Sequence, residues 1–93
     1  MKFRKKPVVI EAIPVSEAVE NADENFSHNP VWLIAAYERG EVIFFEHYIQ
    51  LKTLESGGGW FTADYDDWII RGVQGELYAC KPDIFEMTYE AAE

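Results

Sequence analysis

The chain has 93 residues, a hydrophobic content of 48%, an aromatic content of 15%, one cysteine and a formal net charge of −9. This length predicts a single globular domain over residues 1–93, and one cysteine excludes an intramolecular disulfide framework and favours a reducing compartment. No apolar run approaches the roughly 20 residues that span a bilayer, and Glu11 and Pro14 interrupt the run after the basic start, which disfavours a membrane anchor and a secretory signal.

The charge is distributed unevenly along the chain. Four of the eight basic residues lie within residues 2–6, so residues 7–93 carry four basic and seventeen acidic residues, a net charge of −13. An acidic body repels phosphates, which disfavours direct nucleic-acid binding. The acidity indicates solubility, and the alternative is an acidic face that binds a basic partner or imitates nucleic acid. The basic start is interpreted as a solvated end, with a nucleic-acid or membrane tether as the alternative.

The first predicted element is a strand over residues 7–13. These residues are nearly all apolar, with Glu11 as the one break, which is typical of a strand covered on both sides. Pro14 is expected to end this strand because proline has no N–H group for a ladder.

Two short helices joined by a turn are predicted next. Ser16 is a candidate N-cap for the first helix, and Glu17 lies in its first turn, where it favours the helix dipole. For the second helix, Asn29 is the predicted cap and Pro30 the first helical residue. Gly40 is expected to end this helix because glycine tolerates the left-handed conformation.

Residues 41–46 and 48–54 then predict two strands, because the first is rich in β-formers and the second alternates between apolar and polar residues. They are separated only around His47, which indicates a tight hairpin. Residues 56–59 are predicted to form a flexible turn, and residues 60–63 a short strand.

The last third predicts a hairpin of residues 68–71 with residues 77–80, because Gly72 and Gly75 bracket the loop between two β-forming runs. Pro82 then opens a short helical turn. Its predicted apolar face consists of Ile84, Phe85 and Tyr89. The chain is therefore predicted to be α+β: two short helices packed on a small, mostly antiparallel β-sheet or partly closed barrel of about five or six strands, closed by a short C-terminal helical turn.

Two stretches carry a resemblance to a known group of proteins. The opening is residues 4–12 (RKKPVVIEA), and the closing is residues 67–90, which contain DWIIRGVQGELY, CKPDIFE and TYE. In these stretches the chain resembles a widespread family of small proteins encoded by tailed phages and prophages. The resemblance implies a phage or prophage protein acting in the bacterial cytoplasm, and it implies no particular activity. Such proteins often have a Pro-Gly-Asp turn where this chain has residues 65–67, so the turn before Trp68 is expected to differ.

Cys80 is a candidate nucleophile because it is the one thiol of the chain. Lys81 lies beside it in the sequence, and His28 or His47 could approach it in space. The favoured interpretation is a small buried hydrophobic residue at the end of a strand.

The loop of Asp64, Asp66 and Asp67 is a candidate site for a hard cation. It lacks the glycine and the twelfth-position glutamate of an EF-hand loop, so a solvated turn is favoured. Glu46 and His47 are adjacent in a strand and point to opposite faces, so they do not form a ligand pair. We therefore expect no catalytic residue, no cofactor and no metal.

The aromatic residues exceed what one small core can hide, which predicts that some form a protein interface or a ligand pocket. The alternative is a half-buried aromatic core with polar tips outside. The candidate binding residues are Trp32, Tyr48, Trp60, Trp68 and Tyr78.

The favoured hypothesis is a non-enzymatic binding protein that acts on a host protein or a small ligand, with homo-oligomerisation left open. The alternatives are a small enzyme centred on Cys80 or the loop of residues 64–67, and a structural accessory of the virion. A closed pocket lined by polar groups would favour a ligand binder or an enzyme, and a flat aromatic surface would favour a protein partner.

Overall fold

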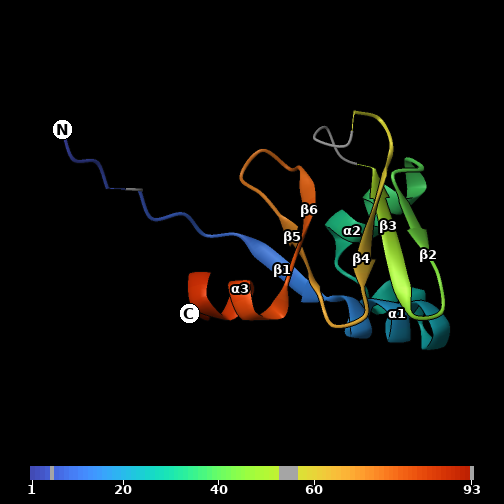
Figure 1. The fold of residues 1–93 in the computed structure, drawn as a ribbon. Helices are drawn as coiled ribbons and strands as arrows, with labels where there is room; N and C mark the ends of the chain where they lie inside the picture. The colour runs from blue at the N-terminus through green and yellow to red at the C-terminus, as the bar shows by residue number, and fades with distance from the viewer. Residues whose placement is uncertain (5, 53–56, 93) are drawn as a thin grey trace.

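The computed structural model describes residues 1–4, 6–52 and 57–92. In Figure 1 the residues before the first strand extend away from the body, and the last helix lies apart from the other two. The elements are, in chain order, β1 (Glu11–Pro14), α1 (Val15–Glu24), the 3-10 turn η1 (Phe26–His28), α2 (Val31–Glu38), β2 (Val42–Phe44), β3 (Tyr48–Lys52), β4 (Trp60–Asp64), β5 (Trp68–Arg71), β6 (Leu77–Cys80) and α3 (Pro82–Thr88).

The predicted α+β class, with its antiparallel pairing and C-terminal helix, is confirmed. Within the described residues the six strands form two three-stranded antiparallel sheets, β1–β5–β6 and β2–β3–β4, hereafter the first and the second sheet. The first sheet joins the beginning of the chain to its end, because β1 pairs with β5. Its strand β6 lies against β3 and β4 of the second sheet, so β1 is the edge farthest from the second sheet.

The main core lies where α1 and α2 meet the inner faces of both sheets. In β3, Ile49 and Leu51 are fully buried whereas Tyr48 and Lys52 are exposed, which confirms the alternation predicted for this strand. The residues of this core are Ile13, Val15, Ala18, Val19, Leu33, Ala36, Val42, Ile49, Leu51, Ala63 and Ile69.

A second apolar layer lies on the other face of the first sheet, under α3. Successive residues of a strand point to opposite faces, so Ile69 points into the main core and Ile70 points toward α3. Ile70 is fully buried although it is not part of the main core. Beside it the ring of Trp68 stacks on Phe85, with centroids 4.0 Å apart and planes 4° from parallel. The first sheet is therefore covered on both faces.

The predicted N-terminal strand is too long and was wrongly placed in the interior. β1 begins at Glu11, and the side chains of Val8 and Val9 are 51% and 77% exposed. The reason is the length of the neighbouring strand: Glu11 pairs with Arg71, the last residue of β5. Residues 7–10 therefore pass beyond the end of β5 and have no ladder partner there.

Both predicted helices form, but each begins at a different residue from the predicted one. Pro14 holds the cap position of α1, and Ser16 lies inside the helix without making a cap bond. Ser16 is not needed as a cap because the backbone N–H of Val15 donates to the carbonyl oxygen of Asp67 at 2.9 Å. Glu17 lies in the first turn, as predicted.

Pro30, rather than Asn29, holds the cap position of α2. The Asn29 side chain is buried and turned back to α1, where it donates to the carbonyl oxygen of Ala18 at 3.2 Å. It also accepts a hydrogen bond from Asn21, so its role is to join the two helices. The predicted end at Gly40 is confirmed, with a φ of 77°.

The two predicted hairpins are confirmed. β2 and β3 pair across the segment that contains His47. β5 and β6 pair with Ile69 opposite Ala79. Of the two glycines that bracket their loop, Gly75 has a positive φ, 85°, and Gly72 does not. Residues 53–56, which belong to the predicted end of β3 and the start of the glycine turn, lie outside the described residues.

The C-terminal helical turn forms as α3, with Pro82 at its start. Its predicted apolar face is only partly correct. Phe85 and Tyr89 are half-buried against the first sheet, whereas Ile84 is exposed. The spacing of four residues between Phe85 and Tyr89 places both on one side of a helix, and Ile84 lies outside that stripe.

Candidate functional site

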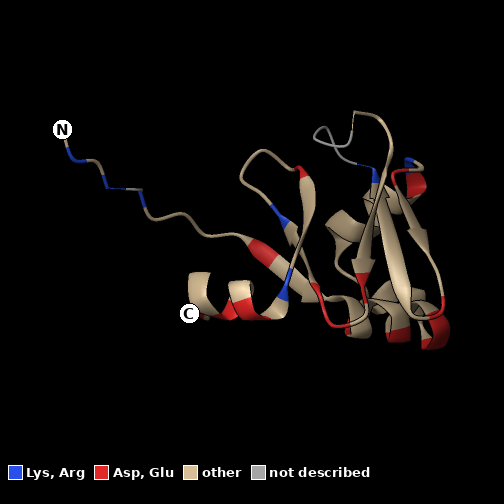
Figure 2. Ribbon diagram, in the orientation of Figure 1, with Lys and Arg blue, Asp and Glu red and all other residues tan. Residues whose placement is uncertain are grey.

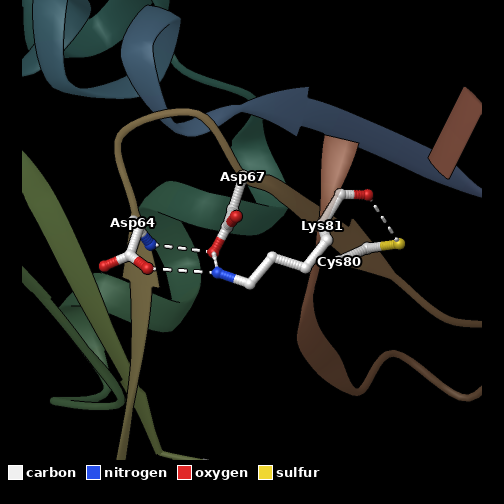
Figure 3. A network of polar contacts seen from close by, with 4 residues as sticks. All are labelled: Asp64, Asp67, Cys80 and Lys81. Atoms are coloured by element: carbon white, nitrogen blue, oxygen red, sulfur yellow. Dashed lines mark hydrogen bonds and ion pairs between the residues drawn. The ribbon is translucent and has the colours of Figure 1, made fainter. Parts of the chain in front are cut away.

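The candidate cation loop is closed by Lys81. The carboxylate oxygen Oδ2 of Asp67 accepts from the backbone N–H of Asp64 at 2.9 Å and from Nζ of Lys81 at 3.2 Å. Nζ of Lys81 also lies 3.1 Å from Oδ2 of Asp64. Figure 3 shows the lysine side chain reaching from the end of β6 to both carboxylates. The two carboxylates thus have an ammonium group as their counter-charge.

The same turn also connects the two sheets. Asp67 is 3% exposed, whereas Asp64 and Asp66 are exposed, so the predicted solvated turn is buried at its last residue. The backbone N–H of Asp67 donates to the carbonyl oxygen of Asp64 at 2.9 Å, which closes the turn between β4 and β5. Asp67 therefore holds β4, β5, α1 and Lys81 together, a structural role.

The turn between β4 and β5 contains no glycine. Among the described residues every positive φ belongs to a glycine, so Tyr65 and Asp66 form this turn with ordinary backbone angles. In the part of the chain that is described, no group of three or more His, Cys, Asp or Glu side chains could hold a metal ion.

Cys80 is the last residue of β6 and is half-buried. Burial raises the pKa of its thiol, and the negative charges of Asp67 and Asp83 raise this pKa further. The Lys81 ammonium does not offset the effect, because it extends toward the two carboxylates and away from the sulfur (Figure 3). The thiol is therefore held in its protonated form, which is the unreactive one.

The two histidines are engaged elsewhere. His28 lies 3.3 Å from the side-chain nitrogen of Asn25 in the 3-10 turn. His47 lies edge-on to the ring of Tyr65, with centroids 6.0 Å apart, in a groove of about 550 Å³ beside α1. In the described residues neither histidine shares a hydrogen bond, ion pair or ring contact with Cys80.

The outward surface of the second sheet, hereafter the outer face, carries exposed apolar side chains. Trp60 is 42% exposed and Tyr48 is 37% exposed, at opposite ends of the paired strands β3 and β4. The ring of Phe45 stacks on Tyr48, with centroids 4.5 Å apart and planes 10° from parallel. Strand alternation and register place seven residues on the outer face: Ile43, Tyr48, Gln50, Lys52, Trp60, Thr62 and Asp64.

A second surface feature is a groove of about 680 Å³ beside the first sheet, hereafter the arm groove. One wall is residues 6–10, hereafter the arm, together with Ala12. The other wall is formed by Trp68, Phe85 and the segment from Thr88 to Ala92. The arm groove is therefore an extension of the apolar layer under α3 past the edge of the first sheet.

The five candidate binding residues lie in three places. Tyr48 and Trp60 are on the outer face, and Trp32 is half-buried against the main core. Trp68 and Tyr78 belong to the layer under α3, where the hydroxyl of Tyr78 lies 3.4 Å from that of Tyr89. Burial raises the pKa of Tyr78, and Tyr89 raises it further.

Sequence reasoning missed Ile43 as a member of the outer face. The available signal was strand alternation, because Ile43 pairs with Gln50, which pairs with Thr62. The side chains of Gln50 and Thr62 are also joined, since the Gln50 amide donates to the Thr62 hydroxyl at 3.5 Å. An uncharged strip therefore runs across the middle of this face.

Comparison of the chain with models of protein families, with curated proteins and with solved structures found no match. In the part of the chain that is described, no helix is long and apolar enough to cross a membrane. The resemblance to phage and prophage proteins stays a prediction that rests on the opening and closing motifs.

Proposed function

We propose that the protein is a non-enzymatic binding protein of a tailed phage or prophage, which acts in the bacterial cytoplasm by binding a host protein through the outer face. The observation that carries this proposal is the exposure of Trp60, Tyr48 and Ile43 on one surface of the second sheet. Exposed apolar side chains gathered on one surface of a domain commonly mark a protein interface.

The arrangement of the outer face fits a protein partner better than a small ligand. Its centre is uncharged, with Ile43, Gln50 and Thr62 in one row, and its charged residues, Lys52 and Asp64, lie at the ends of the strands. Protein interfaces are depleted of charged residues at their centre. At each end of the outer face a charged residue lies opposite an aromatic one, Lys52 opposite Trp60 and Asp64 opposite Tyr48. Tryptophan and tyrosine are also the residue types that most often carry the binding energy.

The chemistry of Cys80 supports a binding role over catalysis. An enzyme built on this thiol would need a lowered pKa or a nearby base, but burial and two carboxylates raise the pKa. The neighbouring carboxylates are occupied by Lys81 and hold the fold together.

The proposal is tested by affinity capture from bacteria that carry or are infected by a tailed phage, with mass spectrometry of captured proteins and small molecules. The test variant replaces Tyr48 and Trp60 by Ser. The control variant replaces Val31 by Ser, because Val31 is an apolar residue on α2 that is more exposed than either of them. We expect one host protein to bind the wild-type and control chains and to be lost from the test variant. Equal capture by all three chains, or a small molecule alone, would contradict the proposal.

A further inference from the structure

The arm is an exposed apolar extension of an edge strand. It contains Pro7, Val8, Val9 and Ile10, and it leads directly into β1. β-Branched residues favour the extended conformation, and an exposed edge strand is a template for pairing with another chain. Figure 1 shows this segment projecting from the body. The arm groove is lined by this segment and by residues of α3 and of the segment after it.

The volume of the arm groove, about 680 Å³, is in the range of roughly 300–1,000 Å³ of clefts that hold a ligand. Its walls supply the stacked rings of Trp68 and Phe85 and the aliphatic side chains of Val8 and Ile10. An occupant with apolar side chains along an extended backbone would match these walls.

Charge identifies the occupant. Figure 2 shows basic residues gathered before β1 and acidic residues on α3. Four basic residues lie within residues 2–6, whereas residues 7–93 have a net charge of −13. α3 and the segment after it carry Asp83, Glu86 and Glu90. Glu90 lines the groove itself, as does Lys6 of the arm. A segment that is basic and then apolar fits this groove, and the chain itself contains such a segment.

We infer that a second copy of this chain occupies the arm groove, so that the protein forms a two-fold symmetric dimer by antiparallel pairing of the two arms. With the axis at Val9, Val8 lies opposite Ile10 of the partner subunit and Ala12 lies opposite Lys6 of the partner subunit. Directly opposed residues share a face of an antiparallel pair. Val8 and Ile10 of each arm thereby point to the side of the sheet on which Ala12 lines the groove.

This pairing gives partners both to the charged surfaces and to the unpaired backbone groups of the two copies. Each copy offers a basic start and, beside its arm groove, the acidic residues of α3, so a two-fold arrangement uses both surfaces of both copies. The backbone groups of β1 and the arm gain partners, and the two first sheets become one continuous sheet. The inference does not depend on the outer face, which lies on the second sheet.

The test is the mass of the full chain in solution, measured by sedimentation. The test variant is Val9→Asp, since Val9 is exposed in the single chain and its replacement should leave the fold intact. Two carboxylates facing each other across the axis should raise the dimer dissociation constant on the order of 100-fold or more. Val73→Asp is the control, because Val73 is a valine that is also exposed, in the β5–β6 loop. A wild-type monomer, or a dimer that Val9→Asp leaves intact, would overturn the inference.

A second measurement locates the axis. In a Cys80→Ser background, Val9→Cys should form a disulfide-linked dimer under mild oxidation, because directly opposed residues of an antiparallel pair have Cα atoms about 4.5–5.5 Å apart. The same change at Val73 should leave the chain unlinked. Linkage at Val73 and not at Val9 would show that any dimer uses a different surface.

Discussion

The first sheet is covered on both faces, by the main core and by α3, whereas the second sheet is covered on one face and open on the other. On the covered sheet, Trp68 is stacked under Phe85 and Tyr78 lies against Tyr89. On the open sheet, Tyr48 and Trp60 face the solvent. The same residue types thus serve stability in one sheet and are free to bind in the other.

The acidic loop of residues 64–67 also differs in role from the outer face. Asp67 and Lys81 lie where the two sheets meet, and their contacts bind β4 to β5 and to the end of β6. The loop of residues 64–67, which resembles a ligand site in the sequence, has the structural role of connecting the two sheets. Its disruption should change stability before it changes binding.

The largest expected effect is in the covered sheet. Ile70→Ala removes a fully buried side chain under α3, so the free energy of unfolding should fall by about 2–4 kcal/mol. Ile43→Ala on the outer face should cost less than about 1 kcal/mol. Urea unfolding of both variants measures the difference. Similar losses would show that the two sheets are covered alike.

The joint between the sheets comes next. Asp67→Ala removes the buried carboxylate that accepts from the backbone N–H of Asp64 and from Lys81, which should lower the free energy of unfolding by about 1–3 kcal/mol. Asp67→Asn keeps one side-chain oxygen and should lose less. Thermal and urea unfolding give the comparison, and an Asp67→Ala chain as stable as wild type would contradict the structural role.

The hairpin of the covered sheet depends on one glycine more than on the other. Gly75→Ala should destabilise by about 1–2 kcal/mol, because a φ of 85° is strained for a residue with a Cβ atom. Gly72→Ala should cost less, since its Cβ would meet only the flexible carboxylate of Glu76. Equal losses in urea unfolding would rule out a special role for the backbone of Gly75.

The smallest expected effect is a loss of stability at alkaline pH, caused by Tyr78 in the first sheet. Burial and Tyr89 raise the pKa of Tyr78 above its usual value of 10.0, so the folded state favours the neutral phenol. The contribution of Tyr78 is fully present below that usual pKa and is lost as pH rises toward the raised folded pKa. The free energy of unfolding, measured with urea from about pH 8 to about pH 11, should therefore fall less steeply for Tyr78→Phe than for wild type. Identical slopes would mean that Tyr78 ionises equally in both states.

The parts of the fold that were predictable depend on local chemistry. The Gly72–Gly75 loop and the alternation of Ile49 and Leu51 are visible in short windows of sequence. The division into two sheets depends on β1 pairing with β5, and the joint depends on Lys81 meeting Asp67 fourteen positions away. Neither pairing has a local signal, because both are set by how the whole chain packs.

The candidate binding residues, like the fold, were only partly predictable from the sequence. Aromatic surplus indicated a surface, and it correctly included Tyr48 and Trp60 as exposed residues. The aromatic surplus could not separate them from Trp68 and Tyr78. A tryptophan on the open face of a sheet and a tryptophan on a covered face look alike in the sequence. The difference arises because α3 covers the first sheet and leaves the outer face of the second sheet open. α3 is far in the sequence from β4, so no short window of sequence shows this.

The central claim is that the outer face binds through apolar contact and not through charge. The most direct measurement is a titration of the captured host protein with wild type and with Trp60→Ser, at about 0.05 and about 0.5 M salt, since screening acts on exposed charges over a Debye length of about 10 Å at 0.1 M. We predict that Trp60→Ser weakens binding by about tenfold or more while salt changes it little. A steep loss of affinity with salt, together with unchanged binding by Trp60→Ser, would contradict the account.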